Sequence, residues 1–123
     1  MLRLLSAFAL GILVAAPAAF AAGDAAAGKK TFDTICFTCH GPLGKGDGPA
    51  GAALNPPPRD FSKGQFKFDA DKDGKVGTDA DLHLVIKNGA GAYGGNPSMA
   101  PWGASMTDKD IDNLVAYVRS LKQ

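Results

Sequence analysis

Glutamate is absent from this 123-residue sequence, whose 12 acidic side chains are all aspartate, and cysteine and histidine occur only twice each. Aromatic residues make up 8% of the chain, which leaves a small domain without an evident core of large rings. A formal net charge of +1 excludes the strongly basic balance typical of a protein that binds nucleic acid. The hydrophobic content of 46% excludes a wholly disordered chain. What remains is one small globular domain.

Helix-breaking residues, by contrast, are abundant, with 16 glycines and eight prolines. Most of them lie between residues 41 and 98, where the run Asn55-Pro56-Pro57-Pro58 cannot continue a helix, so this half of the chain is predicted to be mainly loop. No segment shows sustained alternation of apolar and polar residues, and no internal repeat is visible. The predicted fold class is therefore all-α, with short helices between long loops.

Three segments have the apolar spacing and the terminal residues of helices. They are residues 25–35, residues 79–88 and a last helix that runs to about Leu121. The second and third each begin with a capping box, in which a threonine and an aspartate three residues later bond to each other's backbone N–H groups. The two pairs are Thr78 with Asp81 and Thr107 with Asp110. Asp24 is the expected N-cap of the first helix.

Residues 1–21 have the pattern of an export signal. An uncharged run covers residues 4–23, and Ala19-Phe20-Ala21 supplies a cleavage sequence of the A-x-A type. An uncleaved membrane anchor is the alternative, since about 20 apolar residues can span a bilayer. The alanine-rich end favours cleavage, which would leave residues 22–123 as a single periplasmic domain with no stable membrane insertion.

Cys36, Cys39 and His40 form a C-x-x-C-H sequence. In this spacing two thiols can add to the vinyl groups of one haem while the adjacent imidazole binds the iron. A thioredoxin-like dithiol would need a preceding strand, and a disulfide beside a chance histidine is a further alternative in an exported protein. Zinc would need four ligands, and beyond these three the chain offers only the distant His83. A covalent haem also supplies the large apolar body that a loop-rich domain lacks.

The second axial ligand of such an iron has three candidates, which are Met99, Met106 and His83. Met106 lies just before the last helix, where it is placed to pack as a hydrophobic staple. His83 lies within a predicted helix and is interpreted as a partly exposed residue. Met99 lies in an irregular, proline-flanked stretch that can lay a thioether over a ring, although a buried loop methionine is the alternative. His40 and Met99 are the predicted axial pair, and an iron with both positions filled transfers single electrons without binding substrate.

Taken together, the pattern resembles the class I cytochrome c family, specifically the small periplasmic cytochromes with one haem, over essentially all of residues 22–123. Gly28 and Phe32 resemble the pair by which the family's N-terminal helix crosses its C-terminal helix, and Tyr117 resembles their partner. The resemblance implies a fold in which these two helices cross and loops wrap around one covalently bound haem c.

The same resemblance assigns individual roles. It implies that Cys36 and Cys39 carry the thioether links, that His40 is the proximal ligand and that Met99 is the distal ligand. The commonest form of the family has a proline directly after the methionine, where this chain has Ala100. In the family a proline carbonyl accepts the other ring N–H of the proximal histidine. Pro49 is the expected acceptor here, and the alternatives are Pro42 or a plain turn at residues 46–49 without this role.

Asp69, Asp71 and Asp73 precede Gly74 in a D-x-D-x-D-G sequence that resembles the start of an EF-hand calcium loop. Three carboxylates around a turn offer the oxygen ligands that calcium prefers. The twelfth position of the loop, where a bidentate glutamate belongs, is Ala80. A solvated polar loop whose aspartates are neutralised by nearby lysines is the alternative. Calcium is thus a candidate second cofactor.

The predicted function is that of an exported single-electron carrier, not an enzyme, which meets its redox donor and acceptor proteins through transient contacts at the haem edge. Lysines such as Lys45, Lys63 and Lys87 are candidates for steering these partners. A dedicated subunit of an oxidoreductase complex is a variant of this role. The alternative from another class is a haem-based ligand sensor or small peroxidase-like enzyme in which Met99 dissociates. A peroxidase would need a distal acid–base group, and no second histidine has a persuasive distal setting.

Overall fold

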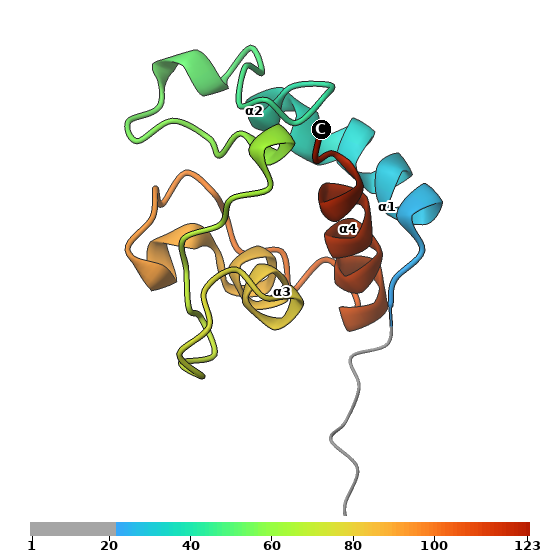
Figure 1. Ribbon diagram of the computed structural model, residues 1–123. Helices are drawn as coiled ribbons and strands as arrows, with labels where there is room; N and C mark the ends of the chain where they lie inside the picture. The colour runs from blue at the N-terminus through green and yellow to red at the C-terminus, as the bar shows by residue number, and fades with distance from the viewer. Residues whose placement is uncertain (1–21) are drawn as a thin grey trace, which may run out of the picture.

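The computed structural model describes residues 22–123, and the export signal expected at residues 1–21 lies outside the described part. The described residues form helices and helical turns joined by loops, with no strand among them, so the predicted all-α class is confirmed (Figure 1). The elements are α1 (Ala25–Thr31), η1 (Phe32–Cys36), α2 (Phe37–His40), η2 (Gly51–Ala53), η3 (Phe61–Lys63), α3 (Asp79–Asn88), η4 (Ala90–Tyr93) and α4 (Asp108–Ser120). None of the described helices has the length and apolar character needed to cross a membrane.

The N-terminal helix is longer than the predicted 25–35. It begins after Asp24, whose side chain accepts the N–H groups of two residues in the first turn at 2.9 and 3.2 Å, as predicted. The α1, η1 and α2 segments then follow one another without a break as far as His40, and Gly41 ends the run with a φ of 80°. The middle segment, η1, is a π turn, in which the helix is locally widened. The C-x-x-C-H sequence therefore lies at the end of this helical run rather than after it.

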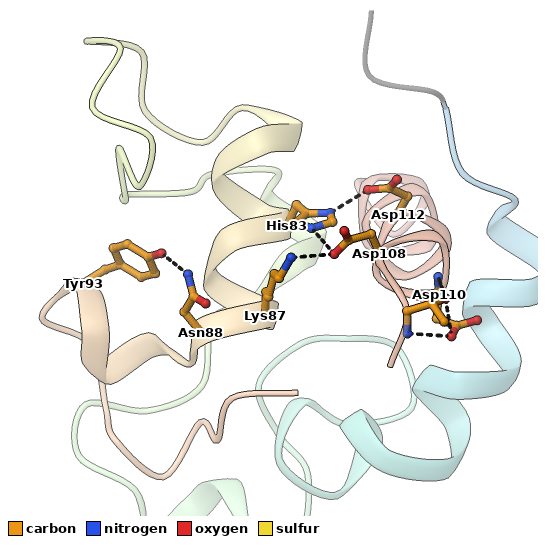
Figure 2. A network of polar contacts seen from close by, with 8 residues as sticks. His83, Lys87, Asn88, Tyr93, Asp108, Asp110 and Asp112 are labelled. Carbon is orange, nitrogen blue, oxygen red and sulfur yellow. Dashed lines mark hydrogen bonds and ion pairs between the residues drawn. The ribbon is translucent and has the colours of Figure 1, made fainter. Parts of the chain in front are cut away.

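Both predicted capping boxes are present. The Thr78 hydroxyl accepts the Asp81 N–H at 3.2 Å while the Asp81 carboxylate accepts the Thr78 N–H at 2.8 Å. Thr107 and Asp110 make the same reciprocal pair at 3.2 and 3.0 Å (Figure 2). α3 accordingly spans the predicted residues 79–88, and α4 ends one residue before the predicted Leu121.

The N- and C-terminal helices cross, as the resemblance implied, and α1 lies beside α4 in Figure 1. Gly28 marks the closest approach, because a β-carbon at this position would lie 1.9 Å from the Asn113 carbonyl oxygen. One turn further on, Phe32 is 1% exposed, and its ring meets the Tyr117 ring edge-on with centroids 5.1 Å apart. Burial of these large side chains against Leu114 and Val118 forms the core of the domain.

A polar network fastens α3 to α4 (Figure 2). His83 is buried, its Nδ1 lies 2.6 Å from an Asp112 carboxylate oxygen, and its Nε2 lies 3.3 Å from an oxygen of Asp108. The Lys87 ammonium donates to the same Asp108 at 2.7 Å. The interpretation of His83 as a partly exposed residue was wrong, because the packing of α3 on α4 covers its ring.

Candidate functional site

A largely apolar cavity of about 410 Å³ lies among α2, the proline-rich loop, α3 and the loop before α4. Its size and apolar walls are typical of sites that hold a cofactor or another small molecule. All four residues predicted to hold haem line this one cavity. They are Cys36, Cys39, His40 and Met99. Phe61, Phe66, Leu82 and Ile86 supply much of the apolar wall.

The two thiols are free, so no disulfide joins Cys36 to Cys39 in this structure. Both side chains are half-buried at the edge of the cavity. Burial raises the pKa of the Cys36 thiol to about 11, and the neighbouring Cys39 acts in the same direction. Both sulfur atoms are thus available on one helical turn for bonds to a group in the cavity.

His40 is held by the carbonyl of Arg59, toward which its Nδ1–H points at 3.3 Å. Burial lowers the pKa of His40, and the hydrogen bond to Arg59 opposes this shift, so the neutral imidazole that binds metals is favoured. With Nδ1 engaged, Nε2 is the nitrogen that can bind a metal. The prediction that the Pro49 carbonyl accepts the His40 ring N–H was wrong. The loop after His40 folds back onto the α2 carbonyls, and the segment that follows the proline run lies beside the imidazole instead.

Met99 is the one distal candidate that lines the cavity, since neither Met106 nor His83 is among the lining residues of the described part. Its loop is tied to the end of α3. The Ala90 N–H donates to the Met99 carbonyl at 3.2 Å, and a β-carbon at Gly89 would lie 2.8 Å from that same oxygen. Met106 packs against the core, in keeping with the predicted staple.

The carboxylates that lie together in the aspartate loop are not the predicted set of Asp69, Asp71 and Asp73. Carboxylate oxygens of Asp69 and Asp71 lie within 4.8 Å of one another and of buried Asp81, which takes the place expected for Asp73. Asp69 accepts the N–H groups of Asp73 and Gly74 at 3.0 and 2.9 Å. These carboxylates thus bond to the loop's own backbone, as in the polar-loop alternative, and calcium binding stays a prediction.

Asp81 stabilises this loop from within. Asp81 is 1% exposed. Its carboxylate accepts hydrogen bonds from the N–H groups of Ala70, Asp71 and Thr78 and from the Thr78 hydroxyl. Burial by itself would raise the pKa of Asp81, but these hydrogen bonds outweigh it and hold the pKa below its ordinary value. The ionised carboxylate therefore contributes its full stability above about pH 4, the pKa of an aspartate in the unfolded chain. This contribution is lost as the pH falls through the lower pKa of Asp81 in the folded protein.

Replacing Asp81 with asparagine is expected to reduce the free energy of unfolding at pH 7 by about 2 kcal/mol, because one accepting carboxylate oxygen becomes an amide NH2 group, which donates and cannot accept. Denaturant titrations at pH 7 and pH 3 measure this, and the difference from the wild type should shrink in acid. Asp47→Asn, the same change at an exposed aspartate outside this network, is the control. An equal loss at both pH values would contradict the role of the ionised carboxylate.

One residue of the site was missed by sequence reasoning. The ring of Phe61 stacks on the His40 imidazole, with centroids 4.5 Å apart and 20° between the planes. The only signal in the sequence is an aromatic residue shortly after the proline run. No pattern of neighbouring residues shows that the chain returns there to the C-x-x-C-H helix.

The comparisons with known proteins agree with this geometry. The family model described as Cytochrome c matches residues 25–122. Cytochrome c-554(547) of Halothiobacillus neapolitanus is 35% identical over 103 residues, which cover 82% of this chain and all of that protein. A chain in the structure of the reducing HAO-like protein complex of Kuenenia stuttgartiensis matches with a TM-score of 0.64 and 29% identity. That match covers 78% of this chain but 41% of the other, so this chain spans less than half of its solved neighbour.

The apolar cavity, the free thiols and the neutral imidazole fit a covalently bound haem, which is the cofactor of this family. The family match extends over the helices, the loops and the cavity alike. The chain belongs to the cytochrome c family, as a class I c-type cytochrome that carries electrons with haem c.

Proposed function

We propose that this protein is an exported carrier of single electrons in which Cys36 and Cys39 hold one haem c and His40 and Met99 bind its iron. The observation that supports this is the convergence of these four side chains, from segments far apart in the sequence, on one apolar cavity. The distal alternative His83 is engaged with two aspartates of α4 instead. The pattern of residues 1–21 supports removal of that segment on export to the periplasm.

The haem, when bound, supplies the one-electron chemistry at its iron. The residues of this chain hold it and set its properties. Thioether links at Cys36 and Cys39 would anchor the ring to the N-terminal helical run, and the Arg59 carbonyl keeps His40 in one tautomer. A neutral thioether at Met99 favours the reduced iron and so raises the reduction potential. Because backbone hydrogen bonds hold the Met99 loop to α3, the same ligands can stay in place in both oxidation states.

Two segments without charged residues flank the cavity, residues 48–58 and 88–107. The side-chain amide of Asn96 joins them by donating to the Pro56 carbonyl at 3.2 Å, and both loops lie on the same side of the molecule in Figure 1, in green and in orange. Redox partners that approach the haem at this rim, between these two segments, would meet side chains without charge, although Arg59, Asp60 and Lys67 also line the cavity. Contact here would be driven by apolar burial rather than by the lysines predicted to steer it, one of which, Lys87, pairs with Asp108.

Electron self-exchange between oxidised and reduced copies, measured by NMR line broadening, tests this rim. The rate is expected to change by no more than about twofold when the ionic strength rises from about 0.01 to 0.5 M, since screening acts only on charges. Ser98→Lys places like charges at the rim of both copies and should slow exchange at low salt. Ser120→Lys, at the exposed end of α4, is the matched control. A slow wild type that salt accelerates would show that charged faces meet instead.

Similarity to a chain of the reducing HAO-like complex supports a variant of this role, in which the protein is a dedicated subunit of an oxidoreductase complex. Size-exclusion chromatography of the periplasmic fraction separates the two forms. A free carrier elutes at the size of one small domain, and a subunit elutes with its complex.

Optical spectra of the purified protein, oxidised and reduced, test the proposal as a whole. The ferric form is expected to show the weak far-red band of sulfur bound to iron, and the haem should stay with the polypeptide on a denaturing gel. A haem spectrum without that band, together with rapid binding of carbon monoxide or peroxide, would favour the sensor or peroxidase-like alternative. Haem that separates from the polypeptide would contradict the thioether links at Cys36 and Cys39.

A further inference from the structure

The His40 imidazole is held from two directions by one short segment, residues 59–61. The Arg59 carbonyl accepts its Nδ1–H, and the Phe61 ring stacks on its face. The torsion that turns a histidine ring is intrinsically broad, so neighbouring groups must set it. A single hydrogen bond at 3.3 Å restrains one ring atom, whereas a parallel ring at 4.5 Å restrains the whole imidazole plane.

Phe61 is itself firmly held, so it can act as a fixed wall. Its N–H donates to the Gly44 carbonyl at 2.7 Å, in the loop that follows His40. Asp60 caps the η3 turn by accepting the N–H and the hydroxyl of Ser62 at 3.0 and 2.6 Å. Other aromatic rings also pack against Phe61.

Two aromatic neighbours complete this support. Phe66 stacks on Phe61 with centroids 6.0 Å apart, and Phe32, from the buried core, meets it edge-on at 6.5 Å. Phe61 thus connects the helix-crossing core to the imidazole. A ring packed in this way cannot turn aside without disturbing the core.

We propose that Phe61 is a positioning residue for the proximal ligand, whose ring sets the rotational angle of the His40 imidazole plane above the haem. The inference rests on the proposed role of His40 as that ligand. Groups around a ligating histidine orient the ring and tune the metal. The angle of the imidazole decides which iron d orbitals its π electrons meet, and so how unpaired spin is distributed around the haem in the ferric protein.

NMR of the ferric protein measures this distribution through the order and spread of the haem methyl resonances. Phe61→Leu is expected to change that order and to alter the spread at least about twofold more than Phe68→Leu does. Phe68 is a matched control, because its ring also lines the cavity but packs against Tyr93. Phe61→Tyr keeps the stacked ring and should retain the wild-type pattern.

A merely structural Phe61 gives a different result. Phe61→Leu would then lower the thermal midpoint, as Phe68→Leu would, while the methyl order stays that of the wild type, and the inference would be overturned. Phe61→Met, which keeps much of the volume without a ring, carries the same test if the leucine variant fails to fold.

The wild type alone provides a second measurement. In the diamagnetic ferrous protein, nuclear Overhauser effects should join the ring protons of Phe61 and His40, and their absence would also overturn the inference. Failure of the proposed function is distinguishable, because the wild-type protein itself would then lack the resonances of an iron-bound imidazole.

Discussion

The variant Met99→Ala is expected to lose the far-red ferric band and to have a reduction potential lower by about 0.2 V, a fraction of the ~0.8 V range that axial ligands cover. The thioether stabilises the reduced iron, and its removal leaves water or an empty position on the distal side. Optical spectra and a potentiometric titration measure both effects. The ferrous variant should also bind carbon monoxide at once, whereas the wild type should bind it slowly.

Met106→Ala is the matched control for this experiment. Met106 packs against the core outside the cavity lining, so its removal should reduce stability and leave both the band and the potential near the wild-type values. A ferric spectrum unchanged in Met99→Ala would contradict the axial assignment. Loss of the band in Met106→Ala alone would transfer the assignment to that residue.

A second large effect is expected at the helix crossing, where Gly28→Ala should reduce the free energy of unfolding by about 3 kcal/mol or more. The added β-carbon would lie 1.9 Å from the Asn113 carbonyl oxygen, which is main chain and cannot move aside. α1 and α4 must therefore separate, and the contact of Phe32 with Tyr117 loosens with them. Denaturant titration of the haem-loaded protein measures the loss.

Gly91→Ala is the control, because it makes the same chemical change where the nearest atoms lie 3.3 Å or more from the new carbon. Its stability should stay close to that of the wild type. If Gly28→Ala has an unchanged denaturation midpoint, the two helices do not approach at this residue.

The helix ends were predictable because the interactions that set them are local. A capping box joins residues three apart, so Thr78 with Asp81 and Thr107 with Asp110 could be recognised in the sequence and were found in the structure. The N-terminal helix was predicted too short. The helical run continues to His40 through a π turn, in which Phe32 is buried against α4. The prediction used only the spacing of nearby residues and could not include this long-range contact.

The surroundings of the site were harder to predict. Pro49 was the expected partner of His40, and the structure shows Arg59 instead. His83 was expected at the surface and lies buried between α3 and two aspartates of α4. Each error concerns a contact between segments that are distant in the sequence.

By itself, the sequence determined the helices with their caps, the all-α class and the C-x-x-C-H chemistry, because each depends on residues within a few positions of one another. Only the tertiary structure decided that Met99 shares one cavity with the C-x-x-C-H residues, that the Arg59 carbonyl meets His40, and that Phe61 covers the imidazole. The physical reason is that these contacts arise from the burial of whole helix faces against one another. Such burial depends on many weak interactions over the entire domain, so the contacts that it produces cannot be predicted from a short stretch of sequence.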